Sequence, residues 1–448
     1  MTNRNWNGSF WLAGSEQKAN GSYTALAGEQ PTVVLEEPIV DDPTIKKFVN
    51  SHGELETRFS MDAKASVEAF KPILIHGTLV CGADVSLLSA QNFSGGGTPP
   101  KYKARTAIIG AHVRNGQLFD GLRFQLDDQY WTGHLIPGDS STTTDGAVIR
   151  VDHAPEGSWI VYEAASPRSL RDLEQYVALA CIVLFHLAFD FRPRLREVEV
   201  RIDSGPWLKT LSSRLHDKPK DADIAMLPRE EISVDKIAAW LDLNSKLDGL
   251  ASAVVEPPSG AVQAQALVAT TLIEGIHRRL PYNQARFSNL SGKAIDRIRR
   301  EARRSAARQA EAEGSTDSAE IKDVVGKCVS HFEDVDYNDR ASDIVDEVFA
   351  AVPELSNLVS DMPKLLKKAR NELAHHLVER SSYEDLVDVL RYWTIASLAA
   401  PWILRFLLLL RVGVDAKVLR EKALKHQRFA FVLANISEIA SELEAIDK

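Results

Sequence analysis

Residues 370–376, with the sequence Arg-Asn-Glu-Leu-Ala-His-His, hold the side chains of this chain best suited to chemistry on a phosphodiester. A histidine exchanges protons near neutral pH, and a guanidinium can hold a phosphate through two parallel hydrogen bonds. RNA can be cut by its own 2′-hydroxyl once an enzyme moves protons and stabilises the phosphoryl oxygens. His375 is therefore the candidate general acid or base, Arg370 the candidate phosphate-binding group, and Asn371 could orient the imidazole four residues on.

The sequence around this segment predicts a helix. Ser360 or Asp361 can cap its N-terminus, and Pro363 suits its first turn. One apolar stripe then follows at helical spacing, formed by Leu366, Ala369, Leu373 and Leu377.

The same helical geometry places Asn371 and His375 opposite the apolar stripe, at roughly 100° per residue. Arg370 lies on one flank of the stripe and His376 on the other. Many charged helix faces are simply solvated, so spacing alone leaves a solvated surface open beside a catalytic site. For His376, a packed structural residue and a catalytic one both remain open.

Arg370, Asn371 and His375 resemble the R-N-x-x-x-H signature of HEPN-domain ribonucleases. The resemblance implies an all-α bundle, RNA cleavage without a metal or other cofactor, and a homodimer that brings two motifs together. Glu274 resembles the polar position that some HEPN sites use to orient the motif. An ordinary exposed or ion-paired glutamate is the alternative for this residue.

The N-terminal part of the chain resembles ApeA-type proteins. The resemblance rests on residues 7–14 and 21–23, an aromatic-rich opening, and on strand-like segments at 75–78 and 108–112. It implies a toxin-like endoribonuclease of antiphage defence that acts through abortive infection. The N-terminal domain would sense a phage-derived trigger or restrain the nuclease. The expected substrate is RNA of the host or the phage, with tRNA as one candidate.

Two rivals to the nuclease remain open: a nonenzymatic HEPN scaffold, and an RNA- or protein-binding sensor whose effector is another chain.

A basic patch interrupts an otherwise acidic chain, whose net charge of −9 argues against broad coating of nucleic acid. Its candidate RNA-binding residues are Arg299, Arg300, Arg303 and Arg304, and Lys293, Arg297 and Arg308 lie in the same run. A footprint for an RNA backbone and a solvated helix both fit this pattern.

The chain of 448 residues is too long for one core and predicts an α+β multidomain protein. Residues 1–255 are predicted to be β-rich, as a sandwich or distorted barrel, with a packed helix opening at 166–168. A loop-rich bridge is expected after a strand at 197–202. Residues 256–448 are predicted to be all-α, with helices at 263–280, 293–312, 321–331, 342–351, 364–380, 383–410 and 417–446.

We expect a cytoplasmic protein without metal sites. Three widely separated cysteines form no C-x-x-C pair, and the N-terminus has no apolar signal core. The longest apolar run, 395–410, is interrupted by Pro401 and Arg405. It therefore predicts a buried or dimer-facing helix, and no membrane partner is expected.

Overall fold

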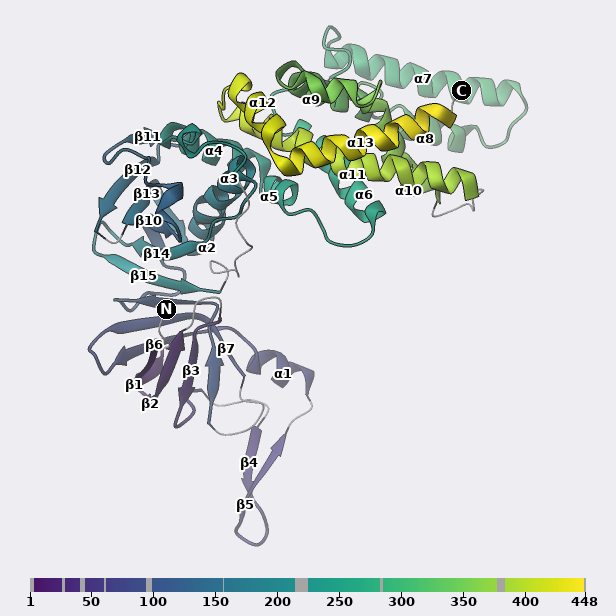
Figure 1. Cartoon of the computed structure of the whole chain (residues 1–448). Coiled ribbons are helices and arrows are strands. Elements are labelled where there is room, and N and C mark those ends of the chain that lie inside the picture. The colour runs from purple at the N-terminus through teal and green to yellow at the C-terminus, as the bar shows by residue number, and fades with distance from the viewer. Residues whose placement is uncertain are drawn as a thin grey trace. The chain divides into compact units, whose positions relative to one another are not determined.

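The computed structural model describes residues 4–25, 29–40, 45–59, 62–93, 99–155, 157–213, 225–282, 285–376 and 383–446. It forms two compact units (Figure 1). Unit 1 comprises Met1–Ser245 and Val412–Val414, and unit 2 comprises Lys246–Arg411 and Asp415–Lys448.

Six strands of unit 1 close into a β-barrel. In order around the ring these are β7 (Asp84–Asn92), β6 (Ile73–Leu79), β1 (Arg4–Leu12), β2 (Lys18–Ala25), β3 (Thr32–Leu35) and β8 (Lys101–Lys103). The pairing of β7 with β8 closes the ring. Alternate residues point inward, and Phe10, Tyr23, Val33, Ile75 and Leu87 fill the interior with no exposed surface. Of the two predicted β architectures, the barrel is the one the chain adopts.

The sheet continues beyond the barrel through seven further strands. From β7 outward these are β9 (Thr106–Ile109), β15 (Trp207–Ser212), β14 (Leu195–Arg201), β10 (Leu118–Leu126), β13 (Gly157–Ser169), β12 (Val148–Ala154) and β11 (Ser140–Thr142). Separate from this sheet are the hairpin of β4 (Ile45–Val49) with β5 (Leu55–Phe59) and the short helix α1 (Ala63–Ala69).

A helical layer accompanies these seven strands. It contains α2 (Leu170–Leu173), one π-helical turn (Glu174–Ala178), α3 (Leu179–Phe189) and α4 (Val234–Leu247). The indole nitrogen of buried Trp240 donates a hydrogen bond of 2.6 Å to the carbonyl of Ala180, which joins α4 to α3.

Two sequence predictions for unit 1 were wrong. The helix expected to open at 166–168 begins only at Leu170, because β13 continues to Ser169, which pairs with Leu118 of β10 and then caps α2. The bridge expected to be loop-rich holds β15, α4 and α5 (Leu250–Val255).

The predicted domain boundary after residue 255 lies at the end of α5, whereas the two units divide after Ser245.

Unit 2 is helical, as predicted. Its further helices are α6 (Val262–His277), α7 (Gly292–Ala312), α8 (Ser318–Cys328), α9 (Tyr337–Ala351), α10 (Met362–His376), α11 (Tyr383–Arg411), α12 (Ala416–Lys425) and α13 (Gln427–Ile446). Helix α11 packs against α6, α9, α10 and α13. The helix predicted over 417–446 is two helices, because the backbone of His426 is extended and ends α12.

Two helical segments are long and apolar enough to cross a membrane, Leu170–Phe189 and Leu386–Arg411. In each, 72% of the most apolar window is buried inside the protein. Such burial is what the core helices of a folded domain show, and it fits the prediction that 395–410 is an interior helix.

Two opposed glycines let the strands of the barrel wall approach closely. Gly8 of β1 pairs directly with Gly21 of β2. A Cβ atom on Gly8 would lie 2.6 Å from the carbonyl oxygen of Thr78, and one on Gly21 would lie 2.4 Å from that of Val34. Only glycine therefore lets the neighbouring strands come this close.

We expect Gly21→Ala to lower the free energy of unfolding by about 1–3 kcal/mol, because the new methyl group overlaps the backbone of β3. Thermal unfolding of the full chain measures the change. Ser22→Ala, at the next position and on the outer face, is the matched control and should unfold close to the wild type. Equal stability of both variants would contradict the close approach at Gly21.

Candidate functional site

Helix α10 presents the predicted motif on a firmly held scaffold. Asp361 caps the helix by accepting a hydrogen bond from the amide of Lys364 at 3.0 Å. Leu366 and Ala369 are buried, and the indole of Trp393 on α11 donates to the carbonyl of Ala369 at 2.9 Å. The predicted cap and the first half of the apolar stripe are confirmed.

The motif residues divide into those whose side chains the structure describes and those it does not. Asn371 is exposed and Arg370 is half-buried, as the helical geometry predicted. His375 and His376 lie in the last turn of α10, and the side chains of both are outside the described residues. Leu377, the last predicted member of the stripe, also lies outside them.

Arg370 forms an ion pair with Glu274, the second residue predicted to belong to the site. The distance from Nη2 of Arg370 to Oε2 of Glu274 is 2.8 Å, and the two side chains are 35% and 20% exposed. The guanidinium also lies over the ring of Tyr337, 4.8 Å from its centre. Tyr337 is itself fixed, because its hydroxyl donates to the carbonyl of Thr270 at 3.1 Å. Helices α6, α9 and α10 thus meet at Arg370.

Glu274 is the carboxylate at the centre of three guanidinium groups. Arg278, one turn further along α6, donates to its Oε1 at 2.8 Å, and the charge of Arg340 on α9 acts on it as well. Burial raises the pKa of Glu274, but the Arg278 hydrogen bond and the charges of Arg370, Arg278 and Arg340 outweigh it and lower the pKa. Glu274 is therefore held as an anion.

Arg340 supplies a buried positive charge to this centre. It is 1% exposed, and its Nε donates to the carbonyl of Val335 at 2.9 Å. Burial, together with the nearby charge of Arg278, lowers the pKa of the Arg340 guanidinium. We refer to Glu274, Arg278, Tyr337, Arg340 and Arg370 together as the arginine–glutamate centre.

The geometry leaves Arg370 able to bind an oxyanion. A guanidinium has five N–H donors, and among the described residues Glu274 engages Arg370 through one terminal nitrogen. The aromatic ring beneath and the carboxylate beside it fix the plane of the guanidinium. A side chain held in this way loses little conformational freedom when it grips a phosphate.

Three members of the centre were missed by sequence reasoning: Arg278, Tyr337 and Arg340. The spacing of Arg278 four residues after Glu274 could have indicated their ion pair. Nothing in the local sequence indicates that Tyr337 and Arg340 face α10.

His277, one turn after Glu274 on α6, is fully buried. Its Nε2 lies 2.8 Å from Asp343, and its ring stacks on Tyr282 with 4.6 Å between ring centres. Burial lowers the pKa of His277 despite the hydrogen bond with Asp343. Helix α9 packs against this side of α6, so the histidine is a core residue.

The four arginines predicted to bind RNA lie on α7 and take two different positions. Arg300 and Arg304 are exposed. Arg299 is half-buried and bonded to the carbonyl of Ser330 at 2.6 Å and to the carboxylate of Glu333. Arg303 lies with its side chain against Gly326 of α8.

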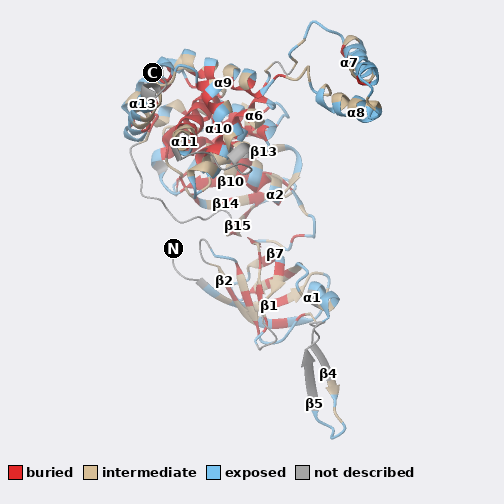
Figure 2. Ribbon diagram, turned by 90° about the vertical axis from the view of Figure 1, so that its right-hand side faces the viewer, coloured by how far each residue is buried: buried red, intermediate tan, exposed pale blue. Residues whose placement is uncertain are grey.

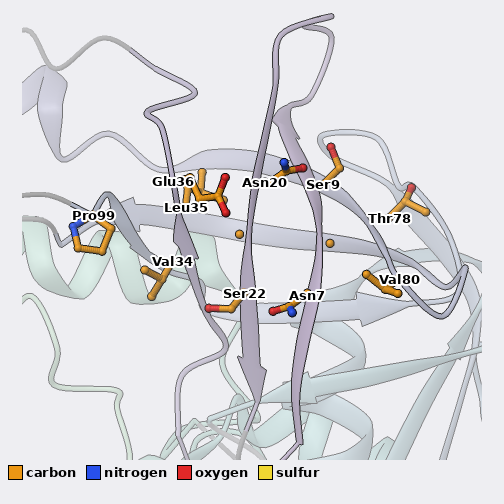
Figure 3. A pocket seen from close by; sticks show the side chains of 12 residues that line it. Asn7, Ser9, Asn20, Ser22, Val34, Leu35, Glu36, Thr78, Val80 and Pro99 are labelled. Atoms are coloured by element: carbon orange, nitrogen blue, oxygen red, sulfur yellow. The ribbon is translucent and has the colours of Figure 1, made fainter.

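Unit 1 has a groove of about 630 Å³ on the outside of the barrel, over the paired glycines (Figure 3). Small polar side chains from β1 and β2 line it, namely Asn7, Ser9, Asn20 and Ser22, with Thr78 and Glu36 beside them. Glu36 is the one titratable residue of this lining. The groove offers hydrogen bonds but not the paired groups that acid–base chemistry needs.

Residues 5–158 match the family model of ApeA N-terminal domain 1. This part of the chain is similar to ApeA N-terminal domain 1. The match covers the barrel and the strands that follow it up to the beginning of β13. No curated protein and no solved structure matches the chain.

We expect Glu274→Gln to destabilise unit 2 by about 1–2 kcal/mol at pH 7, because the neutral amide leaves the guanidinium groups of Arg278 and Arg370 without the anion that pairs with them. The pKa of Glu274 is lower in the folded chain than its ordinary value of 4.5. Its ionised form therefore stabilises the fold above that value, and this contribution disappears as the pH falls through the folded pKa.

Urea titrations followed by far-ultraviolet circular dichroism, at pH 7 and at stepwise lower pH, measure this difference. Glu438→Gln, an exposed position on α13, is the matched control. A gap between wild type and Glu274→Gln that stays constant or widens below pH 4.5 would show that the carboxylate is not the stabilising group.

Proposed function

We propose that this chain is an antiphage endoribonuclease of the HEPN type. The observation that carries the proposal is the ion pair of Arg370 with Glu274, which joins the first residue of the R-N-x-x-x-H motif to the polar residue expected to orient it. The match of residues 5–158 to an ApeA N-terminal domain supports the defence role independently.

In the proposed mechanism, Arg370 binds the scissile phosphate and stabilises the charge that develops on its oxygens. Glu274 acts as a positioning residue by holding the guanidinium plane. His375 removes the proton of the 2′-hydroxyl or protonates the leaving 5′-oxygen. Asn371, exposed on the face of α10 that also carries position 375, orients the imidazole.

One motif supplies one clear acid–base group, whereas the reaction needs a base and an acid. A second copy of the chain would supply the other group, so the active form is proposed to be a homodimer formed through unit 2. The ApeA-type domain would sense the phage-derived trigger. The substrate is proposed to be RNA, the enzyme to need no metal or cofactor, and the protein to act in the cytoplasm.

We expect His375→Ala and Arg370→Ala each to lower RNA cleavage in EDTA by at least about 100-fold, the contribution of a general acid–base group or of one phosphate-stabilising group. Purified full-length protein is incubated with tRNA and with total RNA, and the products are resolved on a gel. His331→Ala, an exposed histidine of unit 2, is the matched control and should cleave like the wild type.

His376→Ala, made beside His375→Ala, separates the two adjacent histidines. Cleavage that survives His375→Ala but is abolished by His376→Ala would move the acid–base role to His376. Equal cleavage by the wild type, Arg370→Ala and both histidine variants would rule out this site as the source of activity.

A further inference from the structure

Four basic side chains form a line along α7: Lys293, Arg297, Arg300 and Arg304. Their spacings of four, three and four residues place them within about 60° of one another around the helix. All four are exposed. Among the described residues, the ion pairs of α7 involve Arg299 and Arg308 instead. We call these four residues the basic stripe.

Two other arginines of α7, Arg299 and Arg303, contact α8 or the segment that follows it. Arg299 is on the side that meets the segment after α8, where it binds Ser330 and Glu333. The aliphatic part of Arg303 occupies the space that a side chain at position 326 would need, 2.8 Å from the ideal Cβ position of Gly326. These contacts hold α7 to α8 and leave the basic stripe facing outward.

The outward face has no described helix packed over it. Helix α8 is the element against which α7 packs most extensively. Figure 2 shows the α7–α8 pair as mostly exposed, with few buried positions. Ile295 and Ala310 are the buried residues of α7, and neither belongs to the basic stripe.

The chemistry of the stripe suits a phosphodiester backbone. From Lys293 to Arg304 it spans about 16 Å at 1.5 Å per residue, the length of about five phosphates at 3.4 Å each along one strand. The helix carries no aromatic residue, so it has nothing on which a base could stack. Contacts made by charge alone position a nucleic acid and do not read its sequence.

We propose that the basic stripe of the α7–α8 pair binds the RNA backbone without regard to sequence, at a surface distinct from the arginine–glutamate centre. This inference rests on the proposed function for the identity of the nucleic acid. The stripe delivers RNA to the chain, and the motif on α10 cuts it.

The test compares two double variants of equal charge in a His375→Ala background, which keeps the RNA intact. Arg300→Gln/Arg304→Gln removes two charges from the stripe. Lys417→Gln/Lys422→Gln removes two exposed charges from α12. Fluorescence anisotropy measures binding of the full chain to labelled single-stranded RNAs of two unrelated sequences, over a range of salt concentrations.

We expect the stripe variant to bind both RNAs at least about tenfold more weakly at low salt, by the same factor for each. The slope of the logarithm of affinity against the logarithm of salt should fall by roughly 1.4, since each neutralised phosphate of a single strand contributes about 0.7. The α12 variant should bind like its parent, and Arg300→Lys/Arg304→Lys should retain most of the affinity.

Three results would overturn the proposal: unchanged binding by the stripe variant, equal losses in both double variants, or binding of polyglutamate as tight and as stripe-dependent as that of RNA. The last result would assign the surface to an acidic protein. Stripe-dependent RNA binding by a chain whose wild type cuts no RNA would uphold the stripe and refute the nuclease.

Discussion

A single carboxylate, that of Glu274, allows three guanidinium groups to share the half-buried junction of α6, α9 and α10. Without it, Arg278 and Arg370 would lose the anion that both are paired with. With it, three helices are joined and Arg370 is fixed in one plane over Tyr337. The same contact that stabilises the fold therefore prepares the side chain proposed to bind phosphate.

The packing of the barrel in unit 1 is set by a different constraint, which is the space available inside a small barrel. Large side chains at Phe10 and Tyr23 fill the interior, and the glycines two residues before each allow the neighbouring strands to close in. The polar groove on the outside of the barrel lies in the part of the chain that matches the ApeA N-terminal domain model.

Local sequence sufficed for the elements whose signals are local. Strand β14 was predicted as a strand at 197–202, and helix α11 was predicted from a long apolar stretch. The start of the helix after β13 was missed because Pro167 looks like a helix-opening residue, while the pairing of Ser169 with distant Leu118 keeps the segment extended. Arg370 and Glu274 were each predicted, but Tyr337 and Arg340 join them only once α9 has packed against α6 and α10.

The segments before α7 and after α8 are held by ion pairs that do not involve the outward face of these helices. Arg299 holds Glu333, and Arg286 forms ion pairs with Asp336 and Asp339 beside it. Substitutions at positions such as 300 and 304 leave these ion pairs intact. The outward surface of the pair can therefore change residue by residue while the helices that carry the arginine–glutamate centre remain as they are. The surface of the pair can thus vary more freely than the helical junction beneath the motif.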